Sequence, residues 1–223
     1  MSAPSKGQRP DPSLRISEVF FSLQGETTRV GLPTVFIRLT GCPLRCVWCD
    51  TAYAFSGGQN QTLSQIMAQV AQYATPWVCV TGGEPLAQKA CLALLTKLCD
   101  ANYQVSLETS GALDISQVDP RVTRVVDLKA PGSGESAKNL WANLPLLTAR
   151  DEVKLVLQDR ADYEWACATL SEHKLYGRCP ILFSPVQGVL APQVLADWIL
   201  ADALPVRLQI QLHKYLWGNV QGK

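Results

Sequence analysis

The chain has 223 residues, of which 47% are hydrophobic, and this length and composition suit one domain with a large core. Its 20 basic and 19 acidic residues leave a net charge of +1, so the composition indicates no basic face for nucleic acid. No uninterrupted apolar run approaches the roughly 20 residues of a membrane span, and the N-terminus lacks the apolar core of a signal peptide. We therefore expect a cytoplasmic protein that binds neither membranes nor nucleic acid.

The first segment, residues 1–14, is polar and rich in proline. It carries too little apolar surface to order itself, so we expect a flexible extension there. We expect the remainder, residues 15–223, to form a single domain.

Beyond Ile16, patterns typical of strands and helices alternate along the chain. Residues 34–39 are β-branched and aromatic and predict a buried strand, whereas Thr62 and Gln65 form a capping box that begins a helix. Further strands are expected at 77–80, 105–108, 122–128, 153–157, 181–184 and 206–212, and further helices at 87–101, 161–172 and 191–201. Strands interleaved with helices favour parallel βα units. Because the chain is shorter than the roughly 250 residues of a closed eight-unit barrel, we predict a partial, open, TIM-like βα barrel.

Three cysteines stand close together directly after the first predicted barrel strand, namely Cys42, Cys46 and Cys49. A closed zinc site or an ordinary electron-transfer cluster takes four ligands, whereas this run supplies three thiolates. A [4Fe–4S] cluster held by three cysteines leaves one iron open, where S-adenosylmethionine (SAM) can bind. The other five cysteines form no CxxC pair and are expected to be small core residues: Cys79, Cys91, Cys99, Cys167 and Cys179.

Polar or glycine-rich segments also follow the next three predicted strands, at 81–85, 108–111 and 127–129. The carboxyl ends of parallel strands share one edge of a sheet, and the chemistry of βα barrels lies there. We therefore expect these segments and the cysteine loop to converge on one mouth.

The CxxxCxxC run followed by Gly-Gly-Glu-Pro resembles the radical SAM superfamily. The resemblance implies that the three cysteines bind the cluster and that reductive cleavage of SAM yields a 5′-deoxyadenosyl radical, which abstracts hydrogen from the substrate. Trp48 is expected near the adenine, and the triplet at 127–129 departs from the Ser-Pro-Lys of some members. The residues implied in SAM binding are Trp48, Cys49, Asp50, Gly82, Gly83, Glu84, Gly111, Asp127, Leu128 and Lys129.

Four further segments, at 22–26, 36–42, 49–51 and 213–218, closely resemble the family of 7-carboxy-7-deazaguanine synthases. This resemblance, which spans residues 16–218, implies conversion of 6-carboxy-5,6,7,8-tetrahydropterin to 7-carboxy-7-deazaguanine with release of ammonia. Such a carbon–nitrogen lyase acts in 7-deazapurine (queuosine) biosynthesis. The resemblance also implies a homodimer that depends on Mg²⁺, and an external one-electron reductant such as flavodoxin or ferredoxin is expected.

The family resemblance also assigns site residues at both ends of the domain. Thr51 matches the magnesium ligand, and the substrate contacts are expected to be Leu23, Gln24, Gly25, Glu26, Arg38, Thr109 and His213. The Arg38 guanidinium suits a substrate carboxylate, although it could instead pair with a core carboxylate. Similarly, His213 could be a satisfied core histidine. No side chain is expected to be catalytic, since the cluster and SAM generate the radical.

Two other classes of function remain open from the residues. An activase of glycyl radical enzymes also carries CxxxCxxC, but it acts on a protein and has no need of the 22–26 segment or Arg38. A zinc-binding or iron-sensing regulator could use the cysteine loop, although the sequence offers neither a fourth nearby ligand nor a basic DNA-binding face.

Overall fold

A single nine-stranded sheet organises the chain, with the strand order β3-β1-β2-β4-β5-β6-β7-β8-β9. The computed structural model describes residues 11–222, so most of the predicted N-terminal extension lies outside the described part. β1 (Ser13–Leu23) is antiparallel to both of its neighbours, β2 (Pro33–Leu39) and β3 (Gln59–Thr62). From β2 onward every pair is parallel, through β4 (Trp77–Gly82), β5 (Gln104–Thr109), β6 (Thr123–Lys129), β7 (Glu152–Leu157), β8 (Ile181–Pro185) and β9 (Arg207–Leu208).

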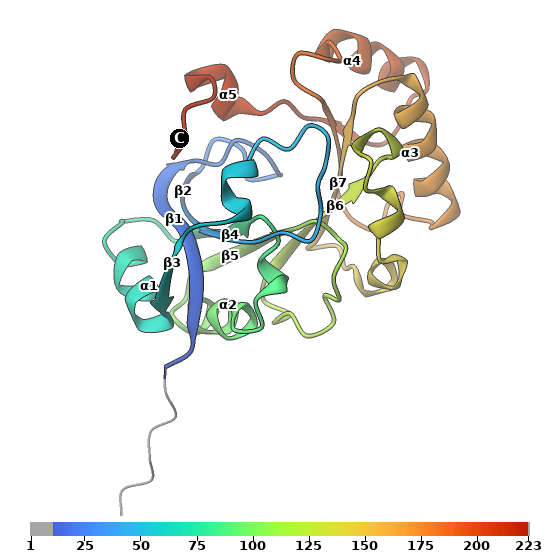
Figure 1. The fold of residues 1–223 in the computed structure, drawn as a ribbon. Coiled ribbons are helices and arrows are strands. Elements are labelled where there is room, and N and C mark those ends of the chain that lie inside the picture. Colours follow the sequence, from blue (N-terminus) through green and yellow to red (C-terminus); the bar gives the residue numbers. More distant parts are fainter. Residues whose placement is uncertain (1–10, 223) are drawn as a thin grey trace, which may run out of the picture.

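Helices follow most of the parallel strands and cover the sheet from outside (Figure 1). The α-helices are α1 (Leu63–Val70), α2 (Cys91–Asp100), α3 (Arg160–Glu172), α4 (Pro192–Ala201) and α5 (Leu212–Trp217). Short 3-10 helices occupy several connections: η1 (Ala52–Phe55), η2 (Pro85–Ala87), η3 (Pro131–Ser133), η4 (Ser136–Lys138) and η5 (Trp141–Leu146). None of the helices within residues 11–222 has the length and apolar character needed to cross a membrane.

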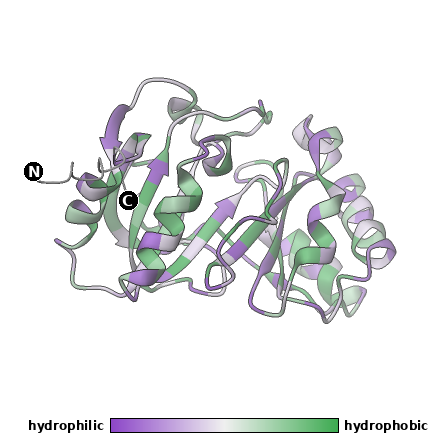
Figure 2. Ribbon diagram, turned by 90° about the horizontal axis from the view of Figure 1, so that it is seen from below, coloured by the Kyte–Doolittle hydropathy of each residue, from purple (hydrophilic) through white to green (hydrophobic). Residues whose placement is uncertain are grey.

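The parallel sheet stays open, which confirms the predicted partial βα barrel. The capping box at the start of α1 is also confirmed: Thr62 Oγ1 accepts from Gln65 N at 3.2 Å, and Gln65 Oε1 accepts from Thr62 N at 2.8 Å. Hydrophobic segments (green in Figure 2) run along the strands and their flanking helices, and several strands become hydrophilic (purple) near their ends. Several strands therefore carry polar residues at the ends where the predicted motifs stand (Figure 2).

Three expectations about the elements need correction. The strand expected at 206–212 is confined to Arg207–Leu208, because the chain then turns toward the mouth of the barrel and α5 begins at Leu212. The helix expected from residue 87 begins at Cys91, since the Gln88 amide donates to the carbonyls of Arg15 and Thr40 and holds residue 88 extended. Ser13 and Leu14 belong to β1 rather than to the N-terminal extension, and Leu14 is only 1% exposed.

The loop between β1 and β2 crosses the amino ends of the parallel strands from the inside. Three residues of this loop make hydrogen bonds to residues far along the chain. Thr27 bonds to Gln209 after β9, and Thr28 bonds to Glu152 in β7. Arg29 donates to Thr123 in β6 and to the Gln104 carbonyl in β5. The Arg29 guanidinium also lies over the Trp77 ring in β4. This loop closes the bottom of the open barrel and places residues 24–26 beneath its mouth.

Candidate active site

A large pocket lies at the carboxyl ends of the parallel strands, as the strand-end motifs predict. Six parallel strands, β2 and β4 to β8, each contribute a polar side chain to its wall: Arg38, Thr81, Glu108, Asp127, Lys154 and Ser184. The cysteine loop lines it on one side, and residues 23–26 and the segment from Gln211 to Lys214 line it on the other. The mouth therefore brings together segments from both ends of the domain.

Cys42, Cys46 and Cys49 all line this pocket as free, half-buried thiols. Burial raises the pKa of both Cys42 and Cys46, and the nearby Lys129 partly opposes this rise. Within residues 11–222, no three His, Cys, Asp or Glu side chains are grouped tightly enough to hold one metal ion. A cubane cluster instead joins each cysteine to a different iron, so three unpaired thiols around one cavity are a donor set that fits it.

The paired glycines at the end of β4 allow the cysteine loop to approach closely. A Cβ atom at Gly83 would lie 2.8 Å from Cys42 Cβ and closer still to the Gly41 carbonyl oxygen. The Gly83 amide donates to the Leu39 carbonyl at 3.1 Å, and the Glu84 amide donates to the Gly41 carbonyl at 2.8 Å. This backbone pairing fixes the start of the loop against β4.

Glu84 is fully buried and joins the ends of β4 and β5. Its carboxylate accepts hydrogen bonds from Ser110 N at 2.7 Å, from Ser110 Oγ at 2.6 Å, and from Thr109 Oγ1 at 2.9 Å.

Among the predicted SAM contacts, Glu84, Gly111 and Leu128 do not line the pocket. Leu128 packs in the core because β6 alternates, with Val125, Asp127 and Lys129 facing the cavity. The other seven predicted SAM contacts do line the pocket: Trp48, Cys49, Asp50, Gly82, Gly83, Asp127 and Lys129.

All seven residues expected to contact substrate line the same pocket: Leu23, Gln24, Gly25, Glu26, Arg38, Thr109 and His213. Gly25 is needed for close approach, because a Cβ atom there would lie 2.9 Å from the His213 Cγ. Burial lowers the pKa of His213, which favours the neutral ring. Arg38 does pair with a carboxylate, since its Nε lies 2.7 Å from Glu18 Oε1, yet it also faces the cavity.

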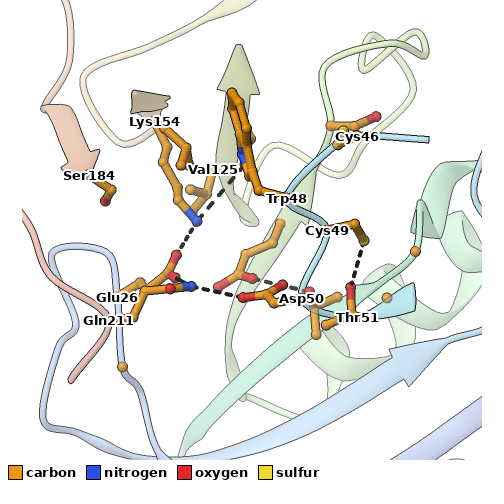
Figure 3. Close-up of a pocket in the computed structure, with 18 of the residues that line it drawn as sticks. Glu26, Cys46, Trp48, Cys49, Asp50, Thr51, Val125, Lys154, Ser184 and Gln211 are labelled. Carbon is orange, nitrogen blue, oxygen red and sulfur yellow. Dashed lines mark hydrogen bonds and ion pairs between the residues drawn. The ribbon is translucent and has the colours of Figure 1, made fainter. Parts of the chain in front are cut away.

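A row of largely buried charges lines the pocket, and within it Lys154 contacts Glu26 (Figure 3). Its Nζ contacts the Glu26 carboxylate and lies 3.9 Å from Asp127 Oδ2, which is in turn 3.0 Å from Lys129 Nζ. Burial favours neutral Glu26, but the charge of Lys154 outweighs this effect and lowers the Glu26 pKa. By contrast, burial and then the Glu26 charge raise the pKa of Glu108.

The C-terminal segment is tied to the cysteine loop. Lys214 Nζ lies 2.8 Å from Asp50 Oδ2, and the Gln211 amide donates to Asp50 at 3.0 Å and to Glu26 at 2.7 Å. Burial opposes the charge on Asp50, but Lys214 and Gln211 together lower its pKa to about 2. Thr51, next along the loop, lines the pocket with its Oγ1 3.8 Å from Cys49 Sγ.

Sequence reasoning missed several polar residues that line the pocket, notably Lys154, Ser184, Gln211 and Lys214. Lys154 had a usable signal, because a cation between Val153 and Leu155 in a buried strand resembles the placement of Arg38 between Ile37 and Leu39. Ser184 Oγ is buried and has no hydrogen-bond partner among the described residues. Nothing in its local sequence distinguishes it from an ordinary strand serine.

Comparison with known proteins gives concordant matches. The profile of the family described as "Radical SAM superfamily" matches residues 36–176. A 7-carboxy-7-deazaguanine synthase of Chlorobaculum tepidum is 47% identical over 92% of this chain and 94% of its own length. A 7-carboxy-7-deazaguanine synthase of Koribacter versatilis is 40% identical over 92% of this chain and 97% of its own length. The crystal structure of QueE from Escherichia coli shares the fold, with a TM-score of 0.75 at 24% identity over 90% of this chain and 95% of that one.

Proposed function

The chain belongs to the radical SAM superfamily and, within it, to the family of 7-carboxy-7-deazaguanine synthases, and from this premise we propose how its pocket works. The reaction is the conversion of 6-carboxy-5,6,7,8-tetrahydropterin to 7-carboxy-7-deazaguanine with release of ammonia. One observation carries the proposal: the three thiols and all seven expected substrate contacts line the same cavity. A glycyl-radical-enzyme activase has no need of the wall that carries these seven residues, the pterin-side wall.

On the cysteine side, Cys42, Cys46 and Cys49 would hold a [4Fe–4S] cluster with one iron open to SAM. When bound, the cluster and SAM supply a one-electron cleavage that ends in abstraction of a substrate hydrogen. Trp48 lies between the cysteine loop and Lys154 (Figure 3), where its ring can pack against an adenine. Asp127 and Lys129, whose charged groups lie 3.0 Å apart, line the same cavity and place one charge of each sign there.

On the opposite side, the residues suit a pterin acid. The Glu26 carboxylate can accept hydrogen bonds from the guanidine-like edge of the pterin, because the charge of Lys154 keeps it ionised despite its burial. Arg38 would receive the substrate carboxylate, and neutral His213 can donate or accept one hydrogen bond. Thr51 would supply one oxygen to Mg²⁺, which completes its shell with substrate oxygens and water.

The partners and the domain organisation follow from the family and remain proposals. The enzyme would act as a cytoplasmic homodimer and would take its electron from a carrier such as flavodoxin or ferredoxin. Apolar side chains exposed around the edge strand β9 and α5 support a self-association surface: Leu208, Ile210, Tyr215 and Leu216. The domain would cover residues 13–223, because β1 adds Ser13 and Leu14 to the expected range 15–223.

An anaerobic assay tests the function. The protein is reconstituted with iron and sulfide and incubated with SAM, a one-electron reductant, Mg²⁺ and 6-carboxytetrahydropterin. We expect 7-carboxy-7-deazaguanine and ammonia in equal amounts without any partner protein, and we expect Cys46→Ala to abolish both. Failure to form product by a protein that retains its cluster and binds SAM would refute the proposal.

A further inference from the structure

An irregularity in β1 turns Glu18 toward Arg38. The register pairs Ile16 with Leu39 and then Glu18 with Arg38, so β1 accommodates one additional residue, Ser17. In a regular antiparallel pair Ser17 would face Arg38, and Glu18 would face Ile37. A β-bulge beside a functional site commonly re-aims a side chain, and here it places a carboxylate opposite the guanidinium.

Three side chains then fix the Arg38 guanidinium. Its Nε lies 2.7 Å from Glu18 Oε1, and the Tyr53 hydroxyl donates to that same oxygen at 2.8 Å. The rings of Phe20 and Tyr53 lie 5.6 and 5.8 Å from Arg38 Cζ. Phe20 is itself stacked on Phe36, with ring centroids 4.9 Å apart. The Arg38 and Glu18 side chains are only 14% and 15% exposed, so few other arrangements are open to them.

This arrangement leaves one edge of the guanidinium for a ligand. Among residues 11–222, Arg38 has a hydrogen-bond partner only at Nε, so neither of its Nη atoms is engaged there. The Nη edge of a guanidinium can donate two parallel hydrogen bonds to a carboxylate. Glu18 also balances the charge of Arg38, so the pair recognises an anion by the geometry of its donors more than by net charge.

We infer that Glu18 and Tyr53 are positioning residues that hold Arg38 so that its Nη edge receives the carboxylate of the pterin. The inference rests on the proposed function and adds to it the residues that set its specificity for a carboxylated ring. Tyr53 belongs to η1, which begins directly after Thr51, the proposed magnesium ligand. The same turn therefore joins the carboxylate receptor to the metal site.

The test compares two ligands that differ only in the carboxylate, 6-carboxypterin and pterin. Binding to the reconstituted protein with SAM is followed by ligand fluorescence under anaerobic conditions, without reductant or Mg²⁺, so that neither turnover nor the metal contributes. We expect the wild type to prefer 6-carboxypterin by about tenfold or more, as suits a charge-assisted bidentate contact. Glu18→Ala should remove most of this preference, and Tyr53→Phe should reduce it.

Two further variants separate positioning from general stability. Glu18→Gln should retain part of the preference, because its amide oxygen can still accept from Nε. Glu164→Gln is the matched control, since Glu164 forms an exposed pair with Arg160 at 2.9 Å on α3, away from the pocket. Iron content and SAM affinity should be unchanged in all four variants.

The outcomes are distinct. If Glu18→Ala and Tyr53→Phe both keep the wild-type preference for 6-carboxypterin, the inference is wrong and the proposed function stands. If Glu18→Ala does not fold, Glu18→Gln takes its place in this comparison. If the wild type itself shows no preference for the carboxylated ligand, Arg38 is not a carboxylate receptor, and the assignment of the pterin side fails with it. Parallel loss of SAM binding and of ligand preference would reveal a structural role only and would also overturn the inference.

Discussion

At the scale of single residues, the charge balance of the pocket depends on Lys154. Glu26 is 7% exposed and contacts this lysine, while Asp127 and Glu108 add further negative charge nearby. A buried carboxylate that loses its only close cation is left uncompensated, and breaking such a pair costs about 3–5 kcal/mol. Lys154→Met should therefore lower the free energy of unfolding in urea by roughly this amount, whereas Lys138→Met, at an exposed position on η4, should change it little.

The same pair gives a pH dependence of known sign. Lys154 holds the pKa of Glu26 below its ordinary 4.5, so its stabilisation is complete above that pH and is lost as the pH falls through the lower value of the folded state. The difference in stability between the wild type and Lys154→Met should consequently shrink as the solution is acidified below pH 4.5. A difference that is constant from neutral to acid pH would contradict the role assigned to this pair.

Residue types near motifs could be predicted, whereas long-range pairings could not. The three cysteines follow from motif spacing, whereas the roles expected of Thr51 and Arg38 follow from the family resemblance. Glu18, by contrast, faces Arg38 only because of a bulge that local sequence does not signal. Gln211 reaches the cysteine loop because the chain turns after β9, which depends on its hydrogen-bonded contact with the β1–β2 loop. The partners of a buried charge are set by such tertiary contacts.

At the scale of elements, the end of β4 is built around the cysteine loop. Gly83→Ala would place a methyl group against Gly41 and the Cys42 side chain, where the backbone must move. We expect this variant to bind less than half of the wild-type iron after reconstitution, as measured by metal analysis and by the absorption of the cluster. Wild-type iron content in Gly83→Ala would show that the loop tolerates the displacement.

The helix cap of α1 provides the contrasting element. Thr62 Oγ1 accepts from Gln65 N at the start of α1, and loss of such a cap costs about 1 kcal/mol. Thr62→Ala should lower stability by that amount while leaving iron content unchanged, since neither Thr62 nor Gln65 lines the pocket. Loss of iron in Thr62→Ala would mean that the cluster loop responds to general destabilisation, and the specific role of Gly83 would then be unsupported.

Elements with a strong local pattern were predicted well, and those formed by distant contacts were not. The parallel strands β2 and β4 to β8 carry apolar, β-branched runs, and α1 has its capping box. β3, whose sequence is Gln-Asn-Gln-Thr, has no strand pattern and exists because it pairs with β1. The short helix α5 begins where the strand expected at 206–212 should end, since the hydrogen bond from Leu212 N to the Gly25 carbonyl at 3.0 Å directs the chain over the mouth.

At the scale of the whole molecule, two segments from opposite ends of the chain compensate for the open barrel. The β1–β2 loop spans the amino ends of the strands, and the C-terminal segment crosses the gap to reach Gly25, Glu26 and Asp50. Figure 1 shows this arrangement, with the C-terminal α5 beside the N-terminal strands. A barrel too short to close thus obtains the pterin-side wall of its pocket from these two segments.

The central claim is that one cavity brings the radical source directly against the pterin. It is tested most directly with 6-carboxytetrahydropterin deuterated at its non-exchangeable ring carbons, incubated anaerobically with the reconstituted enzyme, SAM, reductant and Mg²⁺. Mass spectrometry should find deuterium in the recovered SAM or 5′-deoxyadenosine, in proportion to the 7-carboxy-7-deazaguanine formed, and Arg38→Ala should reduce both together. Formation of the product with no deuterium in either compound would contradict the account.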